Sequence, residues 1–193
     1  MFKPSPLKRA IDLAVAVPLA IVAAPVCVLL LAIVAVESPG SPLLAQQRVG
    51  RGQRTFRMLK IRTMQRDTPQ VASHDVGRAS ITRVGAVLRR LKLDELPQLL
   101  NVIGGSMSLV GPRPCLPSQS VLIAERERRG VFALKPGVTG PAQLMGIDMS
   151  TPERLAEVEA GYFSRSTPLG ELGLIVRTFV GKGRGDAVRA TGG

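Results

Sequence analysis

The sequence predicts an α+β fold that is mostly helical, with an N-terminal membrane helix, a short β-hairpin and interfacial amphipathic helices. Three observations support this: an uncharged apolar run at 13–36, alternating apolar and basic residues at 56–64, and later stretches with helical periodicity. A chain of 193 residues is long enough for one domain with its own core. We expect a re-entrant membrane helix at 1–37, a main domain at 38–181 and a flexible basic tail at 182–193.

The charge balance narrows the class of partner. The net charge of +12, from 26 Lys and Arg against 14 Asp and Glu, favours a phosphorylated substrate, anionic lipid or nucleic acid. Aromatic residues make up only 3% and Trp is absent, so platforms for base stacking are scarce and we expect no nucleic-acid partner. The two cysteines, Cys27 and Cys115, imply no disulfide framework.

The apolar run from Leu13 to Val36 has the length of a membrane helix, about 36 Å at 1.5 Å per residue. Four interpretations remain open: a buried core helix, a cleaved signal peptide, a spanning helix and a re-entrant helix. Pro18 and Pro25 interrupt the run, and Pro25 near its middle is expected to bend the helix. Both flanks are basic, which by the positive-inside rule places them on one side of the membrane. These features favour the re-entrant helix over the spanning one.

A turn cluster at 37–42 ends the apolar run and leads to a basic hairpin. Phe56, Met58 and Ile61 alternate imperfectly with cationic residues, which predicts a short strand or extended hairpin. Its cations form either a solvated face or a phosphate-contacting surface, and the spacing does not decide between these.

Ser80 is a candidate cap for a helix whose apolar stripe runs to Leu91. This helix delivers the chain to Asp94 and Glu95, which we expect at the N-terminus of a helix opened by Pro97 and stopped by Gly104-Gly105. Taken alone, two acidic residues there are more simply explained as helix capping than as a catalytic pair.

The second half of the chain alternates loops and helices. Flanking prolines in Gly111-Pro112-Arg113-Pro114 restrict the backbone around an arginine suited to bidentate phosphate recognition. Lys135-Pro136-Gly137-Val138-Thr139-Gly140 has enough glycine for backbone amides to approach a ligand. Helices are expected at 118–130, at 151–162 and at 169–180, and the last is either interfacial or packed in the core.

In this order the segments resemble the bacterial sugar transferases of the monotopic phosphoglycosyl transferase superfamily, in their small form. The resemblance covers nearly the whole chain, to about residue 180. The motifs that carry it are Lys8-Arg9-x-x-Asp12, Gln47-Arg48-Val49-Gly50, Lys60-x-Arg62-Thr63-Met64, Ile81-Thr82-Arg83-Val84-Gly85, Leu88-Arg89, Leu93-Asp94-Glu95-Leu96-Pro97-Gln98-Leu99-x-Asn101-Val102, Met107-Ser108-Leu109-Val110-Gly111-Pro112-Arg113-Pro114 and Lys135-Pro136-Gly137-Val138-Thr139-Gly140.

The resemblance implies a phosphoglycosyl transferase that moves a sugar-1-phosphate from a UDP-sugar to polyprenol (undecaprenyl) phosphate and releases UMP. It implies Mg²⁺ as cofactor, membrane lipid as surroundings and the cytoplasmic face of the bacterial inner membrane as location. The reaction would be the first membrane step of glycan assembly. The sequence leaves open which sugar is used and whether the chain forms a homodimer.

Residue roles follow from the resemblance by position. Asp94 is expected to be the nucleophile that carries a phospho-sugar aspartyl intermediate, with Glu95 assisting, and the two carboxylates are the expected metal ligands. Nucleotide and phosphate contacts are expected from a further set: Lys60, Arg62, Arg89, Pro112, Arg113 and Pro114. An anionic nucleophile approaching a diphosphate needs such cations to screen the charge.

The chain departs from the family pattern at several positions. Ala24-Pro25 replaces the usual Ser-Pro at the helix break, and Lys92 stands where Ser or Thr is usual. Pro141 replaces a common Trp, and Ile147 replaces a common Arg, which puts one phosphate or sugar contact in doubt.

Two alternatives come from other classes. A non-catalytic, membrane-anchored basic adaptor for anionic lipid or nucleic acid would explain the charge and the apolar helix, but not the acidic pair. A Leloir-type glycosyltransferase would release UDP instead of UMP.

Overall fold

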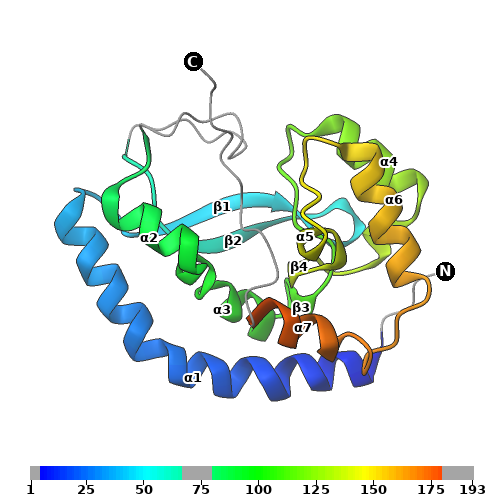
Figure 1. Ribbon diagram of the computed structural model, residues 1–193, viewed down its shortest axis with the longest axis horizontal. Coiled ribbons are helices and arrows are strands. Elements are labelled where there is room, and N and C mark those ends of the chain that lie inside the picture. The colour runs from blue at the N-terminus through cyan, green and yellow to red at the C-terminus, as the bar shows by residue number, and fades with distance from the viewer. Residues whose placement is uncertain (1–4, 67–79, 180–193) are drawn as a thin grey trace.

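The computed structural model describes residues 5–66 and 80–179 as a mixed structure of helices and two-stranded sheets (Figure 1). The helices are α1 (Pro6–Glu37), α2 (Arg83–Leu91), α3 (Gln98–Ile103), α4 (Ser120–Arg128), α5 (Pro141–Leu144), α6 (Pro152–Phe163) and α7 (Leu172–Phe179). The strands are β1 (Leu43–Val49), β2 (Thr55–Ile61), β3 (Ser108–Val110) and β4 (Gly137–Thr139). The predicted mixture of helices with a short hairpin is confirmed, whereas the expected tail at 182–193 lies outside the described residues.

Helix α1 is long, apolar and largely uncovered. It continues through Pro18 and Pro25, and Figure 1 shows it curving beneath the rest of the molecule. Within the described residues it is the one helix with the length and composition to cross a membrane. Large apolar side chains such as Ile21 and Val22 are exposed on it, at 69% and 72%. A core helix of a soluble protein would bury these side chains, so the core-helix interpretation loses its support.

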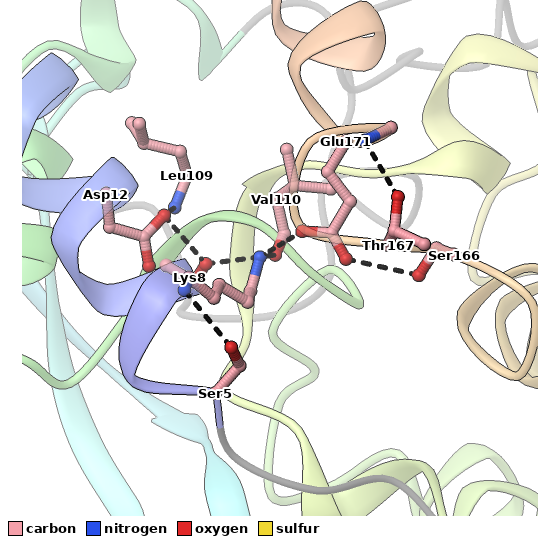
Figure 2. A network of polar contacts seen from close by, with 10 residues as sticks. Ser5, Lys8, Asp12, Leu109, Val110, Ser166, Thr167 and Glu171 are labelled. Atoms are coloured by element: carbon pink, nitrogen blue, oxygen red, sulfur yellow. Dashed lines mark hydrogen bonds and ion pairs between the residues drawn. The ribbon is translucent and has the colours of Figure 1, made fainter.

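The N-terminal end of α1 is fastened to β3 and to the start of α7 (Figure 2). Lys8 Nζ donates to the carbonyl oxygen of Val110 at 3.0 Å and forms an ion pair with Glu171. One turn later, Asp12 Oδ1 accepts the backbone N–H of Leu109 at 3.0 Å and the hydroxyl of Ser108 at 3.1 Å. These contacts account for the Lys8-Arg9-x-x-Asp12 spacing, because positions four apart share a helix face.

The C-terminal end of α1 is fastened to the same domain. Val34 packs with Ile61 of β2 and Leu88 of α2 in a small buried cluster. Glu37 Oε1 accepts the backbone N–H of Val84 at 2.9 Å, at the start of α2. Both ends of the apolar helix therefore contact one folded unit.

Strands β1 and β2 form the predicted antiparallel hairpin, with Leu43 opposite Ile61 and Val49 opposite Thr55. A tight turn at Arg51–Gln53 joins them, and Gly52 in it has φ of +61°. One face of the hairpin points inward and carries polar as well as apolar side chains. Its buried residues are Gln46, Arg48, Met58 and Lys60. The cations of the hairpin therefore divide between a buried face and a solvated one.

Strands β3 and β4 form a short parallel pair, with Ser108 opposite Gly137 and Val110 opposite Thr139. The sequence did not predict this pairing. Glycine is required here by close approach, because a Cβ on Gly137 would lie 2.1 Å from the Gly111 nitrogen. The expectation that these glycines free backbone amides for a ligand is wrong for Gly137, whose N–H donates to the Pro112 carbonyl oxygen at 2.9 Å.

Helix ends agree with the sequence in most places. The cap predicted at Ser80 is wrong, since Thr82 accepts the N–H of Gly85 at 2.9 Å and α2 begins at Arg83. Gly104 ends α3 as predicted, and Thr151 and Pro152 stand at the start of α6. Thr82 directly precedes the first helical residue, which is the position from which a hydroxyl side chain caps a helix.

Two larger cores hold the domain together. The first joins α1, β2, α3 and β3, and includes Ala16, Met58, Val102 and Met107. The second joins α4, α5 and α6 and includes Cys115, Leu122, Leu155 and Ala156. The loop from Gly111 to Pro114 lies between β3, which belongs to the first core, and Cys115, which belongs to the second.

Candidate functional site

The acidic pair occupies a single 3-10 turn, Leu93–Glu95, between α2 and α3. Lys92 ends α2 in the left-handed conformation with φ of +58°, which redirects the chain into this turn. Non-glycine residues adopt this conformation at a cost of about 1 kcal/mol or more, so the surrounding packing enforces it. Asp94 and Glu95 thus lie just before the N-terminus of α3, as predicted, and Asp94 is only 6% exposed.

Glu95 lies between two cations from different parts of the chain. Arg113 Nη2 donates to Glu95 Oε1 at 3.0 Å, and Lys60 Nζ lies 3.6 Å from the same oxygen. All three side chains are between 11% and 17% exposed, so solvent screens these charges weakly. The structure therefore brings together three residues that the sequence singled out from three separate motifs.

Pro112 and Pro114 hold the backbone on either side of Arg113, and both are buried. The carbonyl oxygen of Pro112 accepts the N–H of Gly137, and that of Pro114 accepts a side-chain hydrogen bond from Arg48 at 3.1 Å. The arginine is thus presented from a backbone fixed at both neighbours.

Arg89 and Arg62, also predicted to contact substrate, have different surroundings. Arg89 Nε donates to the Thr63 hydroxyl at 3.0 Å, whereas its Nη1 is buried with no hydrogen-bond partner among the described residues. Arg62 Nη1 donates to the Pro39 carbonyl oxygen at 3.1 Å and Nη2 to that of Ser38, just beyond α1. A terminal nitrogen of Arg89 therefore lacks a partner among the described residues, whereas both terminal nitrogens of Arg62 bond the segment just after α1 and its Nε lacks a partner there.

A mainly apolar cavity of about 280 Å³ opens beside Glu95 and Arg113. Its other cation is Lys92, and its apolar wall includes Leu19 of α1, Leu109 of β3 and Ile175 of α7. Asp94 is not part of this lining. The cavity joins a charged end to an apolar wall that includes a residue of α1.

The metal-binding capacity of the site rests on the two adjacent carboxylates. Among the described residues, no group of three or more His, Cys, Asp or Glu side chains is placed to hold a metal ion. Magnesium commonly binds through one or two carboxylates together with water and substrate phosphate oxygens. Asp94 and Glu95 fit that arrangement but not a cage made of protein ligands alone.

A buried ion pair between α4 and α6 lies against the loop that carries Arg113, and the sequence did not predict it. Arg126 of α4 donates to both carboxylate oxygens of Glu159 of α6, at 2.8 and 2.7 Å, and both side chains are at most 2% exposed. Burial raises the pKa of Glu159, against the lowering effects of Arg126 and of the Arg113 backbone N–H that the carboxylate faces. The sequence predicted a helix at 118–130 but not the burial of Arg126, because that burial depends on α6 covering α4.

Comparison with known proteins agrees with this architecture. The family model described as bacterial sugar transferase matches residues 3–183. A UDP-glucose:undecaprenyl-phosphate glucose-1-phosphate transferase of Caulobacter vibrioides is 42% identical over 144 residues, 72% of this chain and 54% of that protein. A UDP-N-acetylgalactosamine-undecaprenyl-phosphate N-acetylgalactosaminephosphotransferase of Aeromonas hydrophila is 37% identical over 153 residues, 74% of this chain and 36% of that protein.

The relatives differ in how much of their own length the chain matches. The chain spans about half of the Caulobacter protein and a smaller share of the Aeromonas protein. The exopolysaccharide production protein ExoY of Sinorhizobium fredii, 33% identical over 189 residues, is matched over 83% of its length and 89% of this chain. Because this family model matches nearly the whole chain, the chain belongs to the bacterial sugar transferase family.

Proposed function

We propose that the protein transfers a sugar-1-phosphate from a UDP-sugar to polyprenol phosphate and releases UMP. The observation that supports this most strongly is the position of Glu95, held by Lys60 and Arg113 beside an apolar cavity that reaches α1. Cations beside carboxylates suit a diphosphate donor, and an apolar wall continuous with the membrane helix suits a lipid acceptor. The names of the relatives, which act on UDP-sugars and undecaprenyl phosphate, agree with these substrates.

The proposed reaction has two displacements at one phosphorus. A carboxylate oxygen of Asp94 bonds to the phosphorus that bears the sugar, and the bond to the bridging oxygen of the diphosphate breaks. UMP leaves with that electron pair. A phosphate oxygen of the polyprenol phosphate then bonds to the same phosphorus and displaces the Asp94 carboxylate, giving a polyprenyl diphosphate sugar. The choice of Asp94 as nucleophile comes from the family resemblance, since the carboxylate in the cavity lining is Glu95.

Each neighbouring side chain has a role in this scheme. Arg113 and Lys60 hold Glu95 and place positive charge where the diphosphate oxygens develop negative charge. Asp94 and Glu95 would hold Mg²⁺, which when bound supplies further neutralisation of the diphosphate. Glu95 thereby assists Asp94, either as a metal ligand or as a proton acceptor.

We further propose that α1 is a re-entrant helix and that the domain lies on the cytoplasmic face of the bacterial inner membrane. The support is the fastening of both helix ends to one domain, by Lys8 and Asp12 at the start and by Val34 and Glu37 at the end. A helix that crosses a bilayer of about 30 Å has its ends on opposite sides, which conflicts with those contacts.

The reaction is tested with purified full-length protein in nanodiscs, given Mg²⁺, undecaprenyl phosphate and a panel of UDP-sugars. Release of UMP is expected with at least one sugar, and release of UDP would instead support a Leloir-type transferase. With the acceptor omitted, the protein should gain the mass of one sugar phosphate on the peptide containing Asp94.

Variants separate the roles of the two carboxylates. Asp94→Asn should abolish both UMP release and the mass increase, while Glu153→Gln, which removes an exposed carboxylate from α6, should change neither. Wild-type turnover by Asp94→Asn would overturn the assignment of the nucleophile. Steep salt-dependent DNA binding without any nucleotide release would support the adaptor alternative.

A further inference from the structure

The loop that carries Arg113 is held by the end of strand β1. The backbone N–H of Val49 donates to the carbonyl oxygen of Cys115 at 2.9 Å, which adds one antiparallel bridge beyond the hairpin. The preceding residue, Arg48, is 8% exposed, and its Nη1 donates to the Pro114 carbonyl oxygen at 3.1 Å. Main-chain and side-chain contacts from two adjacent residues thus meet the loop immediately after Arg113.

The direction of the Arg48 guanidinium is itself fixed. Gln46 lies two positions earlier on the same buried face, and its Oε1 accepts from Arg48 Nε at 3.2 Å and from Nη2 at 2.7 Å. A planar guanidinium bound along one edge by a single oxygen has little rotational freedom, so Nη1 is directed at Pro114. Burying this cation is costly unless it is well bonded, which makes a purely incidental contact a poor explanation.

Neighbouring contacts restrain the rest of the loop. The Pro112 carbonyl oxygen accepts from the N–H of Gly137, and the Glu159 carboxylate faces the Arg113 N–H. A small cavity of about 10 Å³ is lined by Arg48, Arg113 and Pro114, so the two arginines border the same space. Release of the Pro114 carbonyl would allow the backbone of Arg113 to shift relative to Glu95.

We propose that Arg48 is a positioning residue, which fixes the Pro114 carbonyl and so keeps the Arg113 guanidinium at Glu95, ready for the nucleotide diphosphate. The kinetic effect that we expect rests on the proposed function. The expected effect on the backbone of the loop does not depend on turnover. It gives a role to the Gln47-Arg48-Val49-Gly50 motif, in which the side chain of Arg48 acts through Arg113 without contacting substrate.

The kinetic test is a double-mutant cycle of Arg48→Gln and Arg113→Gln, measured by UMP release across UDP-sugar concentrations. Arg48→Gln should lower kcat/KM about 10- to 100-fold, because displacement of a binding group by about 1 Å has effects of that size. The double variant should be no worse than Arg113→Gln alone. Arg48→Lys should recover part of the loss, since an ammonium can still donate to Pro114. Fully additive losses would overturn the proposal.

Two controls separate positioning from loss of stability. Arg54→Gln removes an exposed cation from the same hairpin and should leave kinetics unchanged. Leu155→Ala leaves a cavity in the second core and removes no hydrogen bond to the loop. It should lower the midpoint temperature of unfolding but leave the KM of the folded protein unchanged. If Leu155→Ala raised the KM for the UDP-sugar as much as Arg48→Gln, a merely structural role for Arg48 would explain the data.

A measurement independent of activity is amide hydrogen exchange of the segment 111–116 in nanodiscs. Exchange should accelerate in Arg48→Gln and stay at the wild-type rate in Arg54→Gln. Unchanged exchange in Arg48→Gln would overturn the positioning role even if the protein turns over. Accelerated exchange in a protein that releases no UMP would support the positioning role while the proposed function fails.

Discussion

Asn101 pairs with the free edge of β2 at Leu59, where its Oδ1 accepts the Leu59 backbone N–H at 2.9 Å. Its Nδ2 donates to the Arg57 carbonyl oxygen at 2.8 Å and contacts the Ser106 hydroxyl at 3.2 Å. This one side-chain amide therefore bonds the backbone N–H and carbonyl groups of β2 that a third strand would otherwise bond. It also joins α3 to the residue before Lys60.

Replacing Asn101 by Ala should destabilise the fold. The change leaves a backbone N–H and a carbonyl of β2 without their partners, and we expect a loss of about 1–3 kcal/mol in the free energy of unfolding. Denaturant unfolding in detergent measures it, with Ser106→Ala as the comparison, because this variant removes the hydroxyl contacts with Asn101 but keeps the pairing with β2. Equal losses in the two variants would show that the pairing with β2 contributes little.

Replacing Gly137 by Ala should prevent normal folding. Its new Cβ would lie 2.1 Å from the Gly111 nitrogen and 2.5 Å from the Thr139 carbonyl oxygen, both backbone atoms that cannot move independently. We expect little folded protein on purification. Gly161→Ala is the matched control, because nothing lies within 4 Å of a Cβ there. A Gly137→Ala protein with a wild-type melting profile would contradict the close pairing of β3 and β4.

Arg89 and Arg62 should respond differently to substitution by Gln. Buried donors are nearly always bonded, so the unpartnered Nη1 of Arg89 is suited to a substrate phosphate oxygen. We expect Arg89→Gln to raise the KM for the UDP-sugar about tenfold, the effect of losing roughly 1.4 kcal/mol of binding. Arg62→Gln should instead lower thermal stability with KM unchanged, because both terminal nitrogens of Arg62 donate to the Ser38 and Pro39 carbonyl oxygens and only its Nε lacks a partner among the described residues. A KM effect confined to Arg62→Gln would reverse the two assignments.

Both flanks of α1 should face the cytoplasm. In a Cys27→Ala background, Ser5→Cys and Ser41→Cys should resist an impermeant thiol reagent in intact cells and react in inverted vesicles. Cys115 is fully buried, and burial raises the pKa of its thiol, so it should stay unlabelled and serve as an internal control. Labelling of the two flanks from opposite sides would rule out the re-entrant helix.

Local patterns predicted local structure well. The alternation around Met58 predicted the hairpin, and the double glycine after Ile103 predicted the end of α3. These features are set by residues close in sequence, through turn chemistry and by the period of apolar side chains. The acidic turn was also found, but only the resemblance to a known family made it a candidate catalytic site.

Long-range relationships were not predictable in this way. Strands β3 and β4 have three residues each, too few to show a period, and their parallel pairing joins segments far apart in the chain. The inward direction of Arg48 and Lys60 depends on register, and a shift by one residue would expose both. The Arg126–Glu159 pair likewise exists only because α6 packs on α4.

The contacts that hold α1 to the domain become possible at different times during synthesis of the chain. Lys8 and Glu171 are 163 positions apart, so the ribosome completes α1 well before it makes this partner. Until that segment is made, α1 has its contacts through Asp12, Val34 and Glu37, but Lys8 lacks its ion pair. A chain truncated before Glu171 should therefore keep the contacts of Asp12, Val34 and Glu37 but hold the start of α1 less firmly.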